Sequence, residues 1–275
     1  MNKKTETWLI FIFLLFFTFL TIYPILNIIS VSLRIDNAFQ TRSLAFIGEN
    51  SGLGTYLQLF TDTPFFLWLR NSLIISIVVT LLGVVLASTS AYALSRYRFK
   101  GRQFGMISLL ITQMFPATML LLPFFILLSK LSLIYSFTGL VIIYSSTALP
   151  FCIWQMKGFY DTIPPSLEES AYLDGCNHFQ AFYKIVLPLS LPALVITALF
   201  SFMSSWSEYV VAAIILQDPE LYTLPLGLKS FQSSLATEWG LYAAGAVVVS
   251  IPVVILFISL ARFLVSGLTM GSVKG

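Results

Sequence analysis

One polar stretch of the chain, "LEESAYLDGCNHFQAFYKIVLP" at residues 167–188, concentrates three carboxylates, a glycine and the only histidine. Glu168 and Glu169 follow a proline pair, and Asp174 precedes Gly175. Carboxylates in a first helical turn are stabilised by the helix dipole, by about 0.3 to 1 kcal/mol each. A short polar segment that carries small and acidic residues between apolar runs is typical of a docking element.

Local signals predict a helix of two to three turns in this stretch. Pro164 and Pro165 end the preceding structure, Ser166 and Glu169 have the spacing of a capping box, and Gly175 suits a left-handed stop. Glu169 therefore either caps the helix or contacts a partner. Leu167, Ala171 and Asp174 share one helical face, where the small Ala171 would let another surface approach closely.

Two other positions are candidate functional residues. Glu208, in "SWSEYVVAAIIL", is the only charge within a predicted membrane span, so it either titrates or pairs structurally with another helix. Pro116, in "QMFPATMLLLP", predicts a kink that either lines a pathway or is an ordinary proline of a helical bundle. Cys152 and Cys176 are too few for a zinc site and are not expected to form a disulfide, and we predict no metal site.

The elements that hold these residues are predicted from composition. With 57% hydrophobic and 10% charged residues, the chain differs strongly from a soluble domain. A membrane span needs about 20 apolar residues, and six runs qualify. The prediction is an all-α, polytopic membrane protein, residues 1–275 forming a single transmembrane domain, with spans near 8–33, 71–95, 104–129, 133–156, 185–216 and 240–261. The first run is expected to be retained, because it lacks a small-residue cleavage site.

The distribution of basic residues predicts the orientation, because lysine and arginine favour the cytoplasmic side. The termini and the even-numbered loops carry ten of these residues, including four in "RYRFKGR", whereas the other side carries five. Both termini and loop 157–184 are therefore expected in the cytoplasm. The small net charge of +3 gives no indication of nucleic-acid binding.

The polar stretch resembles the E-A-A-x-x-D-G-x9-I-x-L-P motif of ABC importer permeases, with Ser170 in place of one alanine. The resemblance implies the type I importer permease fold and a coupling helix that docks in a cleft of a cytoplasmic ATPase subunit. The residues that it assigns to this coupling loop are Glu168, Glu169, Ser170, Ala171, Asp174, Gly175, Ile185, Leu187 and Pro188.

The end of the chain, "GLTMGSVKG", resembles the tail of maltose-type (MalG-like) carbohydrate permeases, G-L-T-A-G-G-V-K-G. Met270 and Ser272 depart from that pattern. The resemblance implies that tail 262–275 contacts the two ATPase subunits, whereas short Gly/Ser-containing ends are otherwise usually frayed. The tail residues that match are Gly267, Leu268, Thr269, Gly271, Lys274 and Gly275.

Two further stretches extend the resemblance. "SWSEYV" is similar to a W-N-E-F stretch of sugar permeases, with Ser207 replacing asparagine. The outer loop 217–239 contains "YTLPLGLKSF", which resembles the Y-T-L-x-x-G-L region where MalG-like proteins meet the sugar-binding protein. Tyr222, Leu224 and Gly227 are the expected contacts.

The resemblance implies a permease subunit of an ATP-driven sugar importer for maltose, maltodextrin, trehalose or a similar glucoside. It would lie in the bacterial inner membrane and form half of the translocation pathway. Its partners would be a second, MalF-like permease, two ATPase subunits, an extracytoplasmic sugar-binding protein and membrane lipid, without nucleic acid. No lysine follows a glycine, so the chain lacks a P-loop. We expect no cofactor on this chain and no catalytic residue, with ATP and Mg²⁺ bound by the partner ATPase. The alternatives are a proton-coupled secondary transporter that uses Glu208, or a membrane scaffold.

Overall fold

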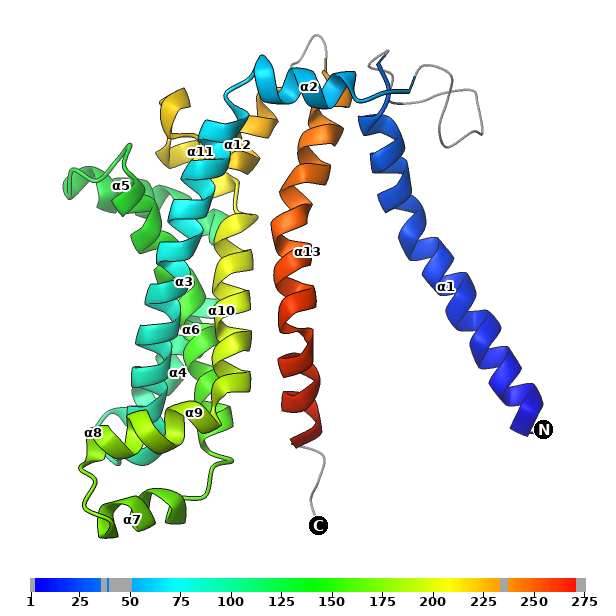
Figure 1. Cartoon of the computed structure of the whole chain (residues 1–275). Coiled ribbons are helices and arrows are strands. Elements are labelled where there is room, and N and C mark those ends of the chain that lie inside the picture. The colour runs from blue at the N-terminus through cyan, green and yellow to red at the C-terminus, as the bar shows by residue number, and fades with distance from the viewer. Residues whose placement is uncertain (1–2, 36–38, 40–50, 233–236, 271–275) are drawn as a thin grey trace. The chain divides into compact units, whose positions relative to one another are not determined.

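The computed structural model describes residues 3–35, 39, 51–232 and 237–270, and it is helical (Figure 1). Within these ranges no strand is formed, and the two β-bridges, Arg34 with Ser51 and Gln232 with Thr237, are isolated. The all-α prediction is confirmed.

Among the described residues, four helices are long and apolar enough to cross a membrane: Lys4–Ser32 within α1 (Lys3–Ser32), α3 (Phe65–Arg96), α6 (Phe137–Tyr160), and Trp239–Ala261 within α13 (Trp239–Met270). The count becomes six if each of two bent helix pairs is one span. The predicted spans 104–129 and 185–216 correspond to these two pairs, each of which is bent by more than 40° at a short break.

The third predicted span is broken between α4 (Arg102–Gln113) and the pair η1 (Ala117–Leu120) and α5 (Leu121–Lys130). The two arms differ in direction by 97°. Pro116 lies at the break with an extended ψ of 132°. Because proline lacks a backbone N–H and disfavours helical geometry in the residue before it, the helix ends here instead of kinking gently.

The fifth predicted span begins with a bend of 78°. The chain passes through α8 (His178–Ala181), a π-helical turn η2 (Phe182–Val186) and α9 (Leu187–Leu189) before α10 (Leu191–Trp206). Pro188 and Pro192 cannot donate to the carbonyls of Lys184 and Pro188, so the helical hydrogen-bond pattern is interrupted twice. The span ends at Trp206, ten residues earlier than predicted, and α11 (Val210–Ile215) is separate.

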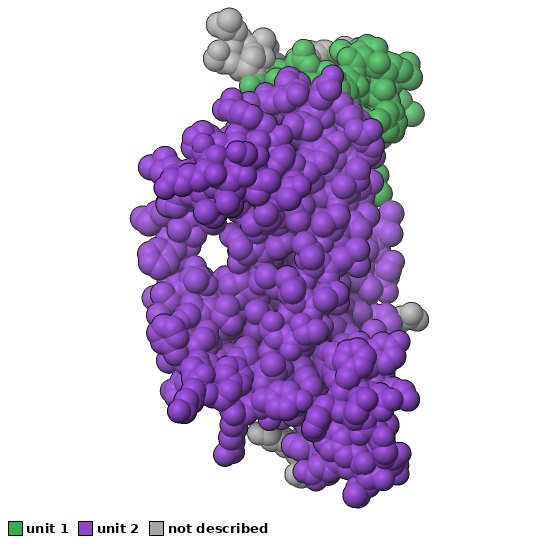
Figure 2. All heavy atoms as spheres, turned by 90° about the vertical axis from the view of Figure 1, so that its left-hand side faces the viewer, with its two compact units in different colours: residues 1–66, 227–252 green, residues 67–226, 253–275 purple. Residues whose placement is uncertain are grey.

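The contacts group the chain into two compact units (Figure 2), of which unit 1 comprises residues 1–66 and 227–252. Within unit 1, α2 (Gly54–Thr61) is held by a hydrogen bond from Thr55 Oγ1 to the carbonyl of Arg34, at 3.0 Å. The rings of Phe39 and Trp239 contact each other with centroids 4.6 Å apart and planes tilted by 41°. The most apolar window of α1 is completely exposed within the described chain, which suits contact with lipid or with another membrane protein.

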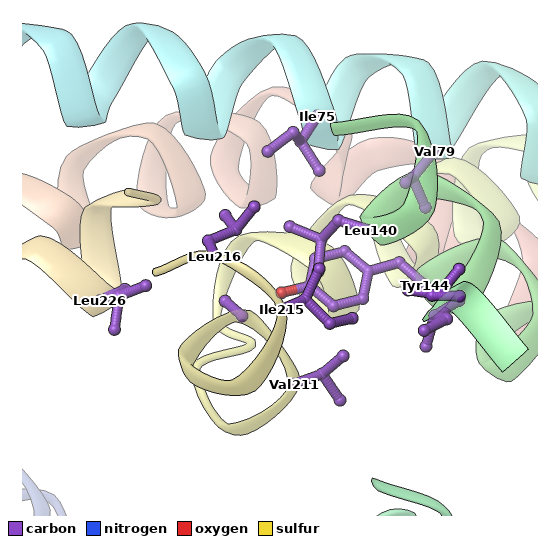
Figure 3. Packing of buried hydrophobic residues seen from close by; sticks show 11 residues of the cluster. Ile75, Val79, Leu140, Tyr144, Val211, Ile215, Leu216 and Leu226 are labelled. Atoms are coloured by element: carbon purple, nitrogen blue, oxygen red, sulfur yellow. The ribbon is translucent and has the colours of Figure 1, made fainter. Parts of the chain in front are cut away.

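Unit 2 comprises residues 67–226 and 253–275, and its centre is the packing of α6 along α10. One apolar cluster joins α3, α6 and α11 through Ile75, Tyr144 and Ile215 (Figure 3). A second cluster includes the small side chains of Ala87, Cys152 and Ala193. Small residues let membrane helices approach closely, and here they bring the ends of α3 and α6 beside loop 157–184.

Two short elements complete unit 2 and lead into unit 1. The 3-10 turn η3 (Pro219–Leu221) is followed by α12 (Leu224–Lys229). Together they replace the irregular outer loop that the sequence predicted in this region.

Candidate functional site

The helix predicted in the polar stretch is α7 (Ser166–Leu173). Its left-handed stop is confirmed, because Gly175 has φ +86°. The Gly175 N–H donates to the carbonyl of Tyr172 at 3.1 Å, and the Cys176 N–H donates to that of Ala171 at 2.9 Å. These two bonds form a Schellman motif, which requires a left-handed residue that is usually glycine.

The predicted capping box between Ser166 and Glu169 is not formed. Pro165 occupies the N-cap of α7 and Ser166 is already helical, so no side chain caps this end. A capping box instead begins α8: the Asn177 side chain accepts from the N–H of Gln180, and the Gln180 side chain accepts from the N–H of Asn177, both at 2.9 Å. The spacing of Asn177 and Gln180 is typical of a capping box, but it was not used in predicting this helix start.

Glu168 is the residue that fastens α7 to the membrane helices. Its side chain is buried, and its Oε2 accepts a hydrogen bond from the Tyr92 hydroxyl at 2.5 Å. Its Oε1 pairs with Nε of Arg96 at 2.5 Å, with side-chain exposures of 13% for Arg96 and 5% for Glu168. Arg96 also donates to the carbonyl of Ile163 at 2.9 Å. We call Tyr92, Arg96 and Glu168 the α3–α7 latch.

A second connection joins α3 to the end of α6. Asp161 accepts from the Ser95 hydroxyl at 2.6 Å and from Lys157 at 2.5 Å. Partial burial by itself raises the pKa of Asp161, but the hydrogen bonds from Lys157 and Ser95 and the charges of Lys157 and Arg102 outweigh burial and hold its pKa below the usual range. The carboxylate is therefore the stable form at neutral pH.

The histidine that stood out in the sequence has an aromatic environment. His178 lies edge to face with Tyr172, at a centroid distance of 4.8 Å, and with Tyr97 at 6.3 Å. It packs the start of α8 against α7 and against the residue that follows α3. Sequence analysis gave it no role.

The outer face of α7 differs from the predicted one. Ala171 is buried, because it lies one turn from Glu168 on the inner face, so it is not available for a partner. Glu169, Ser170 and Asp174 are exposed, and Leu173 is 90% exposed. Phe179 and Tyr183, farther along the loop, are also largely exposed. Exposed apolar side chains in a polar loop are typical of a contact surface.

The remaining residues of the predicted motif form the bend after the loop. Ile185 and Leu187 are half-buried, Pro188 is exposed, and Val186 between them is completely buried in the second apolar cluster. They direct the chain from the loop into α10.

Glu208 lies in the break between α10 and α11, not inside a continuous helix. Its carboxylate accepts from the N–H of Val211 at 2.9 Å and from that of Ala212 at 3.2 Å. The Tyr144 hydroxyl donates to its Oε2 at 2.7 Å. The carboxylate therefore accepts from the free N–H groups at the start of α11 and from Tyr144 of α6. These contacts agree with the alternative in which Glu208 pairs structurally with another helix.

A cavity of about 480 Å³ lies beside the break at Pro116. The side-chain amide of Gln113 at its edge donates to the carbonyl of Thr147 at 3.1 Å. Aromatic rings and short polar side chains line the cavity together, among them Thr112, Phe115, Phe124 and Ser146. Such polar groups are costly against lipid, so in a membrane helix they are expected to face water or another subunit.

The three outer-loop residues differ in exposure. Leu224 is completely buried, and its N–H donates to Ser72 Oγ at 2.7 Å. Asn71 donates to the carbonyl of Tyr222 at 3.0 Å, and Tyr222 is half-buried. Gly227 is buried in α12. In this conformation Leu224 and Gly227 are buried, and Leu224 holds the loop on α3 through its bond to Ser72. The expected contact with a sugar-binding protein stays a prediction.

The predicted tail is partly helical. Gly267, Leu268 and Thr269 lie in the last turns of α13, which extends to Met270. Gly271, Lys274 and Gly275 lie outside the described residues.

Comparison with known proteins gives consistent matches. The family model described as "Binding-protein-dependent transport system inner membrane component" matches residues 80–269. The maltodextrin transport system permease protein MdxG of Bacillus subtilis is 36% identical over 283 residues, covering all of both chains. The arabinooligosaccharides transport system permease protein AraQ of Halalkalibacterium halodurans is 32% identical over 281 residues, again covering both completely.

A solved structure shares the fold. The chain superposes with a TM-score of 0.83 and 25% identity on a subunit of a bacterial ABC transporter involved in the import of the acidic polysaccharide alginate. The match covers 96% of this chain and 99% of that one.

Proposed function

Because the chain belongs to the family of binding-protein-dependent transport system inner membrane components, we propose that it is the permease subunit through which an ATP-driven importer takes up oligosaccharides of the maltodextrin kind. The observation that carries this proposal is α7, an exposed helix fastened to a membrane helix by a buried ion pair. The names of full-length relatives for maltodextrin and arabinooligosaccharide transport support the substrate class.

In this proposal α7 is the docking element for a cytoplasmic ATPase subunit. Glu169, Ser170, Leu173 and Asp174 form the exposed contact surface. ATP and Mg²⁺ would be bound by the ATPase, of which two copies would serve this chain and a second, MalF-like permease. The sugar-binding protein would deliver its ligand on the opposite side, beside the exposed residues Asp218 and Glu220.

Movement of α7 would reach the membrane helices by two routes. The α3–α7 latch links α7 directly to the end of α3, and Asp161 links the end of α6 to the same turn through Ser95. A buried ion pair resists separation because each charge would be left unpaired in a poorly solvated site. A displacement of α7 by the ATPase would therefore move α3 and α6 with it.

The cavity at Pro116 is the candidate for this chain's part of the translocation pathway. Hydroxyl and amide groups such as Thr112 and Gln113 can hydrogen-bond sugar hydroxyls, while Phe115 and Phe124 offer apolar surface. Irregular backbone at membrane depth is tolerated where it lines a water-filled cavity. The broken span agrees with that role, and the second permease would supply the other half.

Charge reversal on α7 tests the docking. Glu169→Lys should leave the protein in the membrane but reduce co-purification of the ATPase subunit and ATP-dependent sugar uptake. Glu220→Lys, an equal charge change at an exposed position far along the chain, is the control and should retain the ATPase. Full recovery of the ATPase with Glu169→Lys, or uptake that persists without the ATPase and collapses with the proton gradient, would contradict the proposal.

The tail can be tested separately. Removal of residues 270–275 should reduce stimulation of ATP hydrolysis more than it reduces assembly of the complex. Unchanged stimulation would show that these residues do not contact the ATPase.

A further inference from the structure

A second cavity, of about 700 Å³, lies on the surface of unit 2 and shares no lining residue with the cavity at Pro116. It is enclosed by the connection from α3 to α4, by the first residues of α4 and by the last turns of α6. Gly101 reverses the chain with φ +89°, a conformation that other residues rarely adopt. We call this cavity the basic pocket, after the cations that line it: Arg98, Arg102 and Lys157.

The basic pocket carries uncompensated positive charge. Lys157 is paired with Asp161. Within the described part of the chain, neither Arg98 nor Arg102 has a carboxylate at ion-pairing distance. Arg102 acts on Asp161 only through its charge, as the lowered pKa of that carboxyl shows. An anionic ligand would supply the missing partners.

Aromatic side chains form the rest of the wall. Phe99 is 51% exposed and Phe104 is 77% exposed. Trp154 lines the pocket from α6, with its indole N–H bonded to the carbonyl of Met106 at 3.3 Å. Exposed phenylalanines beside arginines are unfavourable in water, but they suit the boundary between headgroups and acyl chains.

The position of the pocket agrees with that boundary. It lies where α3 ends at Arg96, where α4 begins at Arg102 and where α6 ends at Tyr160 (Figure 1). These are the ends that the distribution of basic residues places on the cytoplasmic side, where anionic lipids attract lysine and arginine.

We propose that the basic pocket binds the phosphate-bearing headgroup of an anionic phospholipid, with Arg98 and Arg102 on the phosphate and the acyl chains beside Phe99 and Phe104. A soluble phosphate would use the arginines but would leave both rings in water. The acidic surface of a protein partner would likewise leave the two rings without an apolar contact. The combination of unpaired cations with exposed rings at the end of membrane helices therefore favours lipid. This inference does not depend on the transported sugar.

The purified full chain in detergent micelles allows a direct test. Binding of dioctanoyl phosphatidylglycerol is measured by titration calorimetry and native mass spectrometry, beside dioctanoyl phosphatidylcholine and inorganic phosphate. We expect saturable binding of the phosphatidylglycerol and much weaker binding of the other two. Arg98→Gln should weaken the phosphatidylglycerol affinity about fivefold, the effect of one basic residue at an anionic membrane surface.

Lys100→Gln is the matched control, because Lys100 belongs to the same exposed loop but does not line the pocket. It should change the affinity by less than about twofold. Arg98→Lys, which keeps the charge, should retain binding if Arg98→Gln fails to fold. Phe104→Ser should weaken lipid binding while leaving that of phosphate unchanged.

Three results would overturn the proposal. They are equal binding of phosphatidylcholine, binding of inorganic phosphate as tight as that of the lipid, and equal losses with Arg98→Gln and Lys100→Gln. Loss of ATPase association in lipid-free micelles with Arg98→Gln would identify a protein contact and would overturn it as well.

Discussion

Arg96, the last residue of α3, and Glu168, in the first turn of α7, form a buried ion pair at 2.5 Å across 72 residues of sequence. The pair joins the helix that the family motif marks for coupling to a helix that crosses the membrane. Glu168 therefore acts inside this chain, although the motif assigned it to the surface with Glu169.

Removing either partner of the ion pair should lower the free energy of unfolding. Glu168→Leu or Arg96→Met leaves a buried charge without its partner, which typically costs about 3 to 5 kcal/mol. The double variant removes both charges and should recover a large part of that loss. Thermal unfolding of the four proteins in one detergent forms a double-mutant cycle, and additive losses would show that the two side chains are not coupled.

Transport should respond more than assembly in the same series. The double variant replaces a directional ion pair by apolar contact, so we expect ATPase co-purification near the wild-type level with reduced sugar uptake per ATP hydrolysed. If sugar uptake falls only in proportion to ATPase co-purification, the α3–α7 latch does not transmit movement of α7 to α3.

Substitution of Gly175 should destabilise the protein because of the backbone conformation alone. A Cβ here would meet no atom within 4 Å, so the cost of Gly175→Ala is that of a left-handed conformation, about 1 to 2 kcal/mol. Gly175→Asn should cost less, because asparagine tolerates this region. Gly158→Ala, in helix α6 with equally open space, should be neutral or stabilising. Thermal unfolding midpoints compare the three variants, and equal losses for Ala and Asn would contradict this account.

Glu208 should behave as a helix cap. Glu208→Gln keeps an oxygen acceptor for Val211 and Ala212, so it should retain most of the protein's stability and its sugar uptake. Glu208→Ala loses the cap and should cost about 1 kcal/mol or more. Uptake is measured with and without a protonophore at constant ATP. Loss of uptake in Glu208→Gln, together with wild-type uptake that is sensitive to the protonophore, would favour the proton-coupled alternative.

Asp161 predicts a pH dependence at the junction of α3 and α6. Its folded pKa is lowered, so its contribution to stability is present in full above the unfolded pKa, about 3.9. That contribution is lost as the pH falls through the lower, folded pKa. Unfolding midpoints between about pH 6 and pH 3 should fall less steeply for Asp161→Asn than for the wild type. Identical slopes would show that the contacts with Ser95 and Lys157 do not stabilise the folded state.

The elements that depend on local patterns were predictable. Apolar runs of membrane length located α1, α3, α6 and α13, because each is a long uninterrupted helix. The left-handed stop at Gly175 was also predictable, because only a few residue types accept that conformation. The kink at Pro116 was predicted, but its sharpness was not, since hydropathy averages over a window and does not measure the effect of a missing N–H.

The position of the candidate site in the sequence was predictable, but which of its side chains turn inward was not. Glu168 and Glu169 are adjacent and chemically equal, and nothing local to them states which one turns inward. Leu224 looked like a contact residue of an outer loop, but its N–H bonds to Ser72, 152 positions earlier in the chain.

The sequence by itself determined a helical membrane protein with a polar stretch at residues 167–188 and a basic connection near residues 96–102, because composition and charge are read without knowing what packs together. Tertiary structure alone decided that Glu168 is inside and Glu169 outside, that Glu208 caps a helix, and that Arg98 and Arg102 face one pocket. The physical reason is that burial and pairing depend on which distant segments meet. Tyr92 and Arg96 contact α7 because the packing of α3, α6 and α10 in one apolar cluster brings the end of α3 beside it.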